Sequence, residues 1–309
     1  MIKYLSIIAV LFIVSCKAVP VQTSSYQKFE KIETAFGAED VELDSSCTAP
    51  RLLISCDERR ELETQGSIWS YDFETQKAQP LQIDFRYYKS DFHPHGISSY
   101  RDVLFVVNHV SKKQSEILRF SISTDGLKLD TVYKHKAINF PNDLFAVTEN
   151  EFYATNYHYL NGALTYFKNN TFTKIDKGMK LPNGVIKVGN KIIVSTTLSN
   201  NIISYDLNNN YKKEKIFKIK GGDNFSFSNE KLYVSSHPKT GKFFKHYKDS
   251  EKTSPSVIYE LDLKTKEKKV IYSNTTGQIN AASGGLFYKN KLYISQVFEN
   301  FVLIATPYN

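Results

Sequence analysis

A short β-rich unit that recurs six times is the feature that most restricts the fold of this chain. Each copy begins with a polar tip that runs directly into apolar residues, and helical periodicity is nearly absent after residue 35. The six copies lie at residues 39–43, 95–98, 142–147, 183–188, 223–227 and, more weakly, 282–287. A unit that recurs along a chain is typical of solenoids, propellers and arrays.

Two further β-rich runs follow each tip in the same order. The second run is found at 51–55, 103–107, 151–154, 191–194, 231–234 and 291–294. The third run is found at 67–71, 116–120, 163–167, 201–205, 257–261 and 301–304. After most third runs a turn leads to one more such stretch, for example 215–219. Three to four strands in each of six units predict an all-β fold, a six-bladed β-propeller with four-stranded blades over residues 35–309, because a sandwich does not repeat one strand order six times.

The composition supports one large folded domain. The 309 residues are 41% hydrophobic and include 21 Phe and 20 Tyr, which excludes a disordered chain. The net charge of +8 comes mainly from Lys, since only six of the 40 basic residues are Arg. Proteins that read nucleic acids favour Arg forks, so the scattered Lys indicate a solvated surface and no nucleic-acid partner.

The N-terminus predicts export. An apolar core of about ten residues follows Lys3, which is too short for a membrane span but typical of a signal peptide, here residues 1–15. The string Ile13-Val14-Ser15-Cys16 resembles a bacterial lipobox. Acyl chains on Cys16 would anchor the exported protein to a membrane of the bacterial cell envelope, with residues 16–34 as a tether. Ordinary secretion with an unmodified cysteine is the alternative.

Two further cysteines, Cys47 and Cys56, stand nine residues apart around a turn at residues 48–50. In an exported protein, two thiols in one hairpin are candidates for a disulfide bond. The alternative is two free thiols, and the decision depends on their geometry.

The polar tips are expected to meet at a central channel. The first strand of each blade lies nearest the axis of a propeller, so residues at the same phase of successive repeats converge. These residues are Glu39, Asp40, His95, Asn142, Asp143, Asn183, Asp223 and Asn224. Four carboxylates in a narrow channel need a cation, and carboxylate and amide oxygens suit Ca²⁺, whereas no Cys–His cluster has zinc spacing. Ordinary turns, in which Asn and Asp are frequent, are the alternative explanation.

Several strings closely resemble the paraoxonase/arylesterase family, in order from residue 37 to about 300. The most specific pair is Pro94-His95-Gly96-Ile97-Ser98 with Val106-Val107-Asn108-His109. The other strings are Gly37-Ala38-Glu39-Asp40, Asn142-Asp143-Leu144, Phe152-Tyr153-Ala154-Thr155-Asn156-Tyr157-His158-Tyr159, Asn183-Gly184, Asp223-Asn224 and Ser236-His237-Pro238. The resemblance implies a calcium-dependent lactonase and aryl esterase on a six-bladed propeller.

The resemblance also implies two calcium ions in the channel and a histidine pair beside them. The catalytic ion would be held by Glu39, Asn142, Asn183, Asp223 and Asn224. The structural ion would lie deeper and would be held by Asp40, Asp143 and the backbone carbonyl of Ile97. The water-activating pair would be His95 and His109, with His158 in a further segment that lines the site.

Some positions depart from the family pattern. Animal members join the chain ends through a C-terminal Cys, which residues 305–309 lack, so blade closure is expected to rest on strand pairing. Tyr157 stands where the family has Asp before His158, which alters any proton relay through that histidine. Phe225 and Phe298 are candidates for an acyl-binding wall, with core packing as the alternative. The histidines interpreted as structural are His93, His135 and His246.

The expected function is hydrolysis of a lactone or an aryl (carboxylic) ester, in which calcium polarises the carbonyl and the histidine pair activates water. No Gly-x-Ser-x-Gly nucleophile elbow is present, so the sequence does not support an acyl-enzyme route. One alternative is a sugar-lactone hydrolase of the gluconolactonase type, with one divalent metal. The other is a non-catalytic, calcium-stabilised propeller that binds partners at the cell surface.

Overall fold

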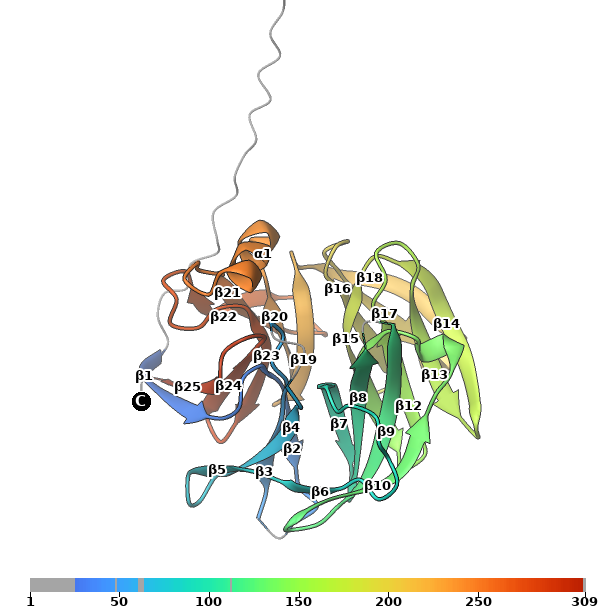
Figure 1. Cartoon of the computed structure of the whole chain (residues 1–309). Helices are drawn as coiled ribbons and strands as arrows, with labels where there is room; N and C mark the ends of the chain where they lie inside the picture. Colours follow the sequence, from blue (N-terminus) through green and yellow to red (C-terminus); the bar gives the residue numbers. More distant parts are fainter. Residues whose placement is uncertain (1–25, 48, 61–63, 112, 308–309) are drawn as a thin grey trace, which may run out of the picture.

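Six antiparallel sheets stand around a central axis, as the repeat predicts (Figure 1). This computed structural model describes residues 26–47, 49–60, 64–111 and 113–307. The first strands of the six blades are β2 (Ala38–Asp44), β7 (Pro94–Tyr100), β11 (Pro141–Thr148), β15 (Pro182–Val188), β19 (Gly222–Ser228) and β23 (Ala282–Tyr288). Each contacts the first strand of the next blade, and the contact between β23 and β2 closes the ring. The predicted six-bladed β-propeller is confirmed.

The remaining strands follow outward from the axis in chain order. The second strands are β3 (Arg51–Cys56), β8 (Val103–Ser111), β12 (Glu151–Asn156), β16 (Lys191–Thr196), β20 (Lys231–Ser236) and β24 (Lys291–Gln296). The third strands are β4 (Ser67–Asp72), β9 (Gln114–Ile122), β13 (Gly162–Lys168), β17 (Asn201–Asp206), β21 (Ser256–Leu261) and β25 (Phe301–Pro307). Every first, second and third run predicted from the sequence falls within one of these strands.

The outermost strands complete the blades. They are β5 (Lys77–Pro80), β10 (Gly126–Tyr133), β14 (Thr171–Met179), β18 (Lys212–Lys218), β22 (Lys268–Asn274) and β1 (Tyr26–Glu33). In the second blade, β6 (Gln82–Asp84) adds a fifth strand parallel to β10. The helical segments are α1 (Thr240–Lys248) and the 3-10 turns η1 (Lys136–Ile138) and η2 (Leu207–Asn209). Within the described ranges, no helix has the length and apolar character needed to cross a membrane.

The sixth blade joins the two ends of the chain. Strand β1 pairs antiparallel with β25, for example Ile32 opposite Val302. Among the described residues the propeller therefore includes 26–33, and the expected tether over 16–34 is wrong for these residues, which form β1. Blade closure rests on strand pairing, as expected. The predicted signal peptide and Cys16 lie outside the described residues.

The expected disulfide between Cys47 and Cys56 is not formed. Both cysteines are free, and Cys56 is buried. Cys47 lies in the turn that follows β2, whereas Cys56 ends β3 and pairs with Ala38 at the other end of the hairpin. The length of the hairpin, about 3.3 Å per residue, separates the two thiols far beyond the reach of a disulfide.

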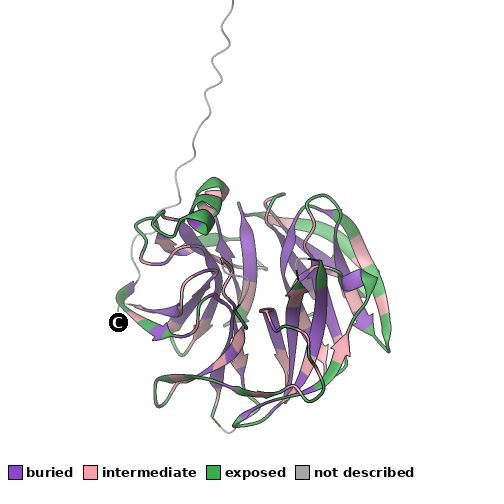
Figure 2. Ribbon diagram, viewed as in Figure 1, coloured by how far each residue is buried: buried purple, intermediate pink, exposed green. Residues whose placement is uncertain are grey.

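The core lies between the blades. Because the second strand of each blade is covered on both faces, it is almost fully buried, and every residue of β3 is buried. Phe105 of β8 packs on Phe152 of β12 in the next blade, with ring centroids 5.3 Å apart. Figure 2 shows buried residues on the inner strands and exposed ones toward the rim. This two-sided burial explains why the second runs are continuously apolar rather than alternating.

Candidate active site

Each first strand contains a one-residue β-bulge near its start. Pro141 and Leu144 are three residues apart in β11, yet their partners in β12 are only two residues apart. The same shift occurs in all six first strands. Side chains alternate along a regular strand, but a bulge re-aims them. Adjacent residues such as Glu39 and Asp40 therefore both reach the neighbouring blade at the channel.

Hydroxyl side chains from the second strands hold these bulges. Ser55 Oγ accepts a hydrogen bond from the backbone N–H of Asp40 at 3.2 Å and donates to the carbonyl of His95 in the next blade at 2.6 Å. Thr155 Oγ1 accepts from the N–H of Asp143 at 3.2 Å and also donates to a carbonyl of the next blade. Ser or Thr is the next-to-last residue of five second strands, a signal that sequence analysis missed.

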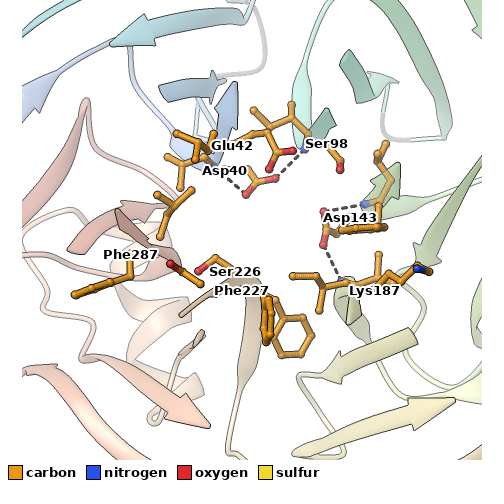
Figure 3. Close-up of a pocket in the computed structure, with 18 of the residues that line it drawn as sticks. Asp40, Glu42, Ser98, Asp143, Lys187, Ser226, Phe227 and Phe287 are labelled. Atoms are coloured by element: carbon orange, nitrogen blue, oxygen red, sulfur yellow. Dashed lines mark hydrogen bonds between the residues drawn. The ribbon is translucent and has the colours of Figure 1, made fainter. Parts of the chain in front are cut away.

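Two buried aspartates, Asp40 and Asp143, face the channel and tie blades together (Figure 3). Asp40 Oδ2 accepts from the N–H of Ile97 at 2.8 Å, and Asp143 Oδ2 accepts from the N–H of Val185 at 2.7 Å. Burial raises the pKa of both carboxyls well above the usual range, and for Asp40 the charge of Asp143 raises it further. The structure thus brings together the residues predicted for the deeper ion.

The residues predicted for the catalytic ion all lie at the starts of first strands. Glu39 Oε2 lies 2.8 Å from Arg59 Nη2 and 2.8 Å from His95 Nδ1. Burial alone would raise the pKa of Glu39, but His95 and Arg59 lower it to about 2. Asp223 Oδ2 lies 2.7 Å from His237 Nε2, and burial raises the pKa of this carboxyl despite that contact. Glu39 is therefore held in its ionised form, whereas burial destabilises the charged form of Asp223.

Two buried amide oxygens of the same set have no partner within the described ranges. They are Oδ1 of Asn183 and Oδ1 of Asn224. A buried acceptor that is left unpaired costs about 1–3 kcal/mol, and such atoms are rare in folded proteins. Hard cations are bound by amide and carboxylate oxygens, so these atoms fit a bound ion of the calcium type.

The predicted histidine pair is formed. The rings of His95 in β7 and His109 in β8 are 4.9 Å apart at an angle of 70°. His95 Nε2 lies 3.1 Å from Asn142 Nδ2, and His109 Nδ1 lies 2.9 Å from Ser115 Oγ. Burial, followed by the charge of His95, lowers the pKa of His109 well below its usual value. His109 is therefore held in its neutral form at physiological pH.

A cavity of about 530 Å³ opens beside this pair on the face where the first strands begin. Phe140 and Tyr157 line it together with His95, His109 and Asn142. Burial raises the pKa of Tyr157, so this side chain is a neutral phenol. This cavity, called the catalytic pocket below, is lined by three histidines, His93, His95 and His109, and by aromatic side chains.

Sequence analysis missed a charged network in the wall of the catalytic pocket. Arg59 bonds through Nη1 to Asp57 Oδ2 at 2.5 Å and through Nη2 to the carbonyl of Pro94 at 2.9 Å, besides its contact with Glu39. Asp57 Oδ1 lies 2.9 Å from His93 Nδ1. Arg59, Asp57 and His93 all line the pocket. The only signal was the charged string directly after the second strand of the first blade.

Three predicted substrate-site residues lie away from the catalytic pocket. His158 Nε2 lies 3.3 Å from Asn139 Oδ1, behind Phe140. Phe298 is buried beneath α1 and stacks with Arg60, as the core-packing alternative predicts. Phe225 lines the opposite end of the channel. None of the three lines the pocket beside the histidine pair.

The donor set explains why no conventional cluster forms. In the described part of the chain, no three His, Cys, Asp or Glu side chains come together in a metal-binding arrangement. The predicted upper donors are amides as much as carboxylates, and Arg59 occupies one side of Glu39. The unpaired oxygens of Asn183 and Asn224 nevertheless lie at the starts of β15 and β19, in the ring of first strands to which Glu39 and Asp223 belong. The residues present therefore fit an oxygen-binding cation.

A six-bladed propeller with a histidine-lined pocket at the mouth of a polar channel is the class of protein that the fold and site define. A family model described as Arylesterase matches residues 60–304, and the chain belongs to this family. Human serum paraoxonase/arylesterase 2 is 27% identical over 266 residues, covering 76% of this chain and 75% of the relative. Human serum paraoxonase/lactonase 3 is 24% identical over the same length, with the same coverage.

Solved structures support the fold alone. A chain of the nidogen/laminin complex superposes with a TM-score of 0.56 at 11% identity, covering 80% of this chain and 84% of that one. A protein described as a putative oxidoreductase (glucose dehydrogenase) from Thermus thermophilus superposes with a TM-score of 0.54 at 11% identity, covering 90% of this chain and 99% of that one.

Proposed function

We propose that this chain is a calcium-dependent hydrolase of lactones and aryl or other carboxylic esters. The observation that carries the proposal is the pair of unpartnered amide oxygens, Asn183 Oδ1 and Asn224 Oδ1, in the ring of first strands that also supplies His95. Membership of a family whose relatives are named arylesterases and lactonases gives the reaction class.

The residues proposed to hold the catalytic ion are Glu39, Asn142, Asn183, Asp223 and Asn224. Those proposed for a structural ion are Asp40, Asp143 and the carbonyl of Ile97. Bound calcium supplies an electrophile that polarises a substrate carbonyl and stabilises the negative charge that develops on its oxygen. Because paired carboxylates such as Asp40 and Asp143 repel in a buried channel, a divalent ion also offsets their burial.

The chain's own contribution to chemistry is proton transfer. We assign the general base to His95 Nε2, whose lone pair would take the proton of an attacking water in place of its contact with Asn142 Nδ2. Glu39 lies 2.8 Å from Nδ1 on the other side of the ring and stabilises the imidazolium that forms. We assign the relay of that proton to His109, whose ring packs against His95 and whose depressed pKa favours releasing a proton over retaining it.

The catalytic pocket suits a small acyl or aryl group. A volume of about 530 Å³ is within the range of small-molecule sites. Phe140 packs against His109 with ring centroids 5.1 Å apart and supplies an apolar wall next to the reacting groups. Tyr157 adds a neutral hydroxyl. These features support a small, partly apolar ester or lactone as the substrate.

We further propose that the protein is exported and lipid-anchored through Cys16 at a bacterial cell envelope. The lipobox-like string 13–16 supports this location. Its partners would then be a membrane, through the acyl chains, and a small-molecule substrate.

A panel of aryl acetates, aliphatic lactones and sugar lactones, assayed with and without a calcium chelator, tests the function. We expect calcium-dependent turnover of an aryl ester or aliphatic lactone, a loss of roughly 10²–10⁴-fold in His95→Gln, and near-normal turnover in His135→Gln, a histidine outside the pocket. Turnover restricted to sugar lactones would favour the gluconolactonase type. No turnover of any ester or lactone would leave the binding-propeller alternative.

A further inference from the structure

The two predicted ion sites open toward opposite faces of the propeller. The catalytic pocket is lined by His95 and Asn142 but not by Asp40 or Asp143. A second cavity, of about 350 Å³, is lined by Asp40, Asp143 and Ile97 but by none of the residues of the catalytic pocket. We call this second cavity the lower vestibule.

The residues that line the lower vestibule stand around the central channel (Figure 3). All six first strands contribute to its wall, each with residues that follow the polar tip. Because the catalytic pocket lies where these strands begin, the vestibule opens on the face where they end. Aromatic side chains stand around it, among them Phe227, which is 42% exposed, and Phe287. The Asp40–Asp143 pair, although buried, lies in the wall of this cavity.

One carboxylate lies between the aspartate pair and the mouth of the vestibule. Glu42 follows Asp40 by two residues on β2, about 7 Å along the strand, on the same face. Its Oε1 accepts from the backbone N–H of Ser99 at 2.7 Å and from Ser99 Oγ at 2.9 Å, which fixes the side chain in the wall. The next carboxylate, Asp44, is bonded to Arg51 at 2.8 Å and belongs to the rim of the blade.

We propose that a divalent cation enters and leaves the Asp40–Asp143 site through the lower vestibule, with Glu42 as a transient ligand on the way. The proposal rests on the calcium assignment of the proposed function and adds the route. Oxygen atoms of Glu42, Asp40 and Asp143 give the cation successive hard ligands as it loses water. The ion that supports the fold therefore exchanges independently of whatever occupies the catalytic pocket.

Charge at the vestibule should then control the rate of exchange. Lys187 lines the vestibule and opposes the approach of a cation, whereas Glu42 attracts it. Charged groups in the wall of a narrow cleft act on an approaching ion and change its association rate. Lys113 offers a matched control, because it is exposed and follows Ser111 of the catalytic pocket on the opposite face.

The test measures calcium exchange in the full chain by stopped-flow mixing. Release into excess fluorescent chelator, and uptake by the metal-free protein, are recorded at low ionic strength. Asn224→Ala removes a proposed ligand of the catalytic ion only, so the phase that persists in this variant belongs to the deep ion. We expect Glu42→Gln to slow deep uptake about three- to ten-fold, Lys187→Gln to speed it about two- to five-fold, and Lys113→Gln to leave it unchanged.

The outcomes distinguish failure of the entry route from failure of the calcium assignment. The route would be overturned if the exchange rate of the deep ion were unchanged in both Glu42→Gln and Lys187→Gln. It would also be overturned if that rate responded to Lys113→Gln or to a product bound in the catalytic pocket. Either result leaves the hydrolase proposal intact. A wild-type chain that binds no divalent cation would overturn the calcium assignment itself, and the route with it. If Glu42→Gln does not fold, Lys187→Gln and its control carry the test alone.

Discussion

Arg59 should weaken the binding of calcium at the proposed catalytic site. Its guanidinium lies 2.8 Å from Glu39 Oε2, on the carboxylate that the ion would share. A charge of +1 and a charge of +2 held by one carboxylate repel by roughly 1–2 kcal/mol even at the dielectric constant of water. Arg59→Gln removes that repulsion. We therefore expect the Kd for calcium at this site to fall by about ten-fold.

The same substitution should destabilise the metal-free protein. Arg59 makes charge-assisted hydrogen bonds to both Glu39 and Asp57, whose side chains are each 5% exposed. Removing one partner of a buried ion pair leaves the other charge uncompensated, typically at about 3–5 kcal/mol. The pair here is partly solvated, so we expect about 2–4 kcal/mol, or a fall in Tm of roughly 3–7 °C for a domain of this size. Stability and calcium affinity should thus move in opposite directions.

Isothermal titration with calcium and thermal melts in chelator provide the two measurements. Arg60→Gln is the matched control, because it removes the same charge from the adjacent residue, which packs on Phe298 rather than on Glu39. A calcium Kd for Arg59→Gln within two-fold of that for Arg60→Gln would refute the reasoning. So would an unchanged Tm in chelator, since the ion pair would then contribute nothing.

The remaining predictions concern pH, blade packing and export. The folded-state pKa of His109 is depressed, so this residue lowers the free energy of unfolding as the pH falls below about 6.5, by up to about 1.4 kcal/mol per pH unit. Urea titrations should show this loss in wild type but not in His109→Gln. Thr155→Val should lower the free energy of unfolding by about 1–3 kcal/mol in the same titrations, because the N–H of Asp143 loses its partner. The exposed Thr171→Val is the control, and an equal loss in both variants would contradict the role of the hydroxyl. Fatty-acid labelling should mark wild type and not Cys16→Ala, and equal labelling would exclude the lipid anchor.

The arrangement of the blades could be predicted because burial on both sides imposes the same pattern six times. The outermost strand of the sixth blade could not. The strand Tyr26–Glu33 buries only Tyr26 and Ile32 and carries four charged residues. An exposed edge strand of this kind has the same composition as a polar tether. Its identity depends on pairing with β25, almost the whole chain away in sequence.

The candidate site divides in the same way. The polar tips were found because equivalent positions of a repeat converge, and the structure places them together. Arg59 was not found, because it reaches Glu39 from the connection between the second and third strands, outside the three runs that define the repeat. Phe225 and Phe298 were assigned on residue type alone, and burial beneath α1 or at the far end of the channel was invisible in their sequence context.

The two proposed ion sites differ in how the protein satisfies their ligands. Asp40 and Asp143 each accept backbone N–H groups from their own blade and from the next, so these side chains join blades whether or not an ion is bound. Asn183 and Asn224 instead keep an unpaired oxygen, which contributes nothing to the fold until a ligand arrives. Asp40 and Asp143 therefore contribute to the stability of the fold, whereas the oxygens of Asn183 and Asn224 are available to a ligand. The residues of both proposed ion sites come from the same recurring feature, a first strand whose bulge turns adjacent side chains toward the channel.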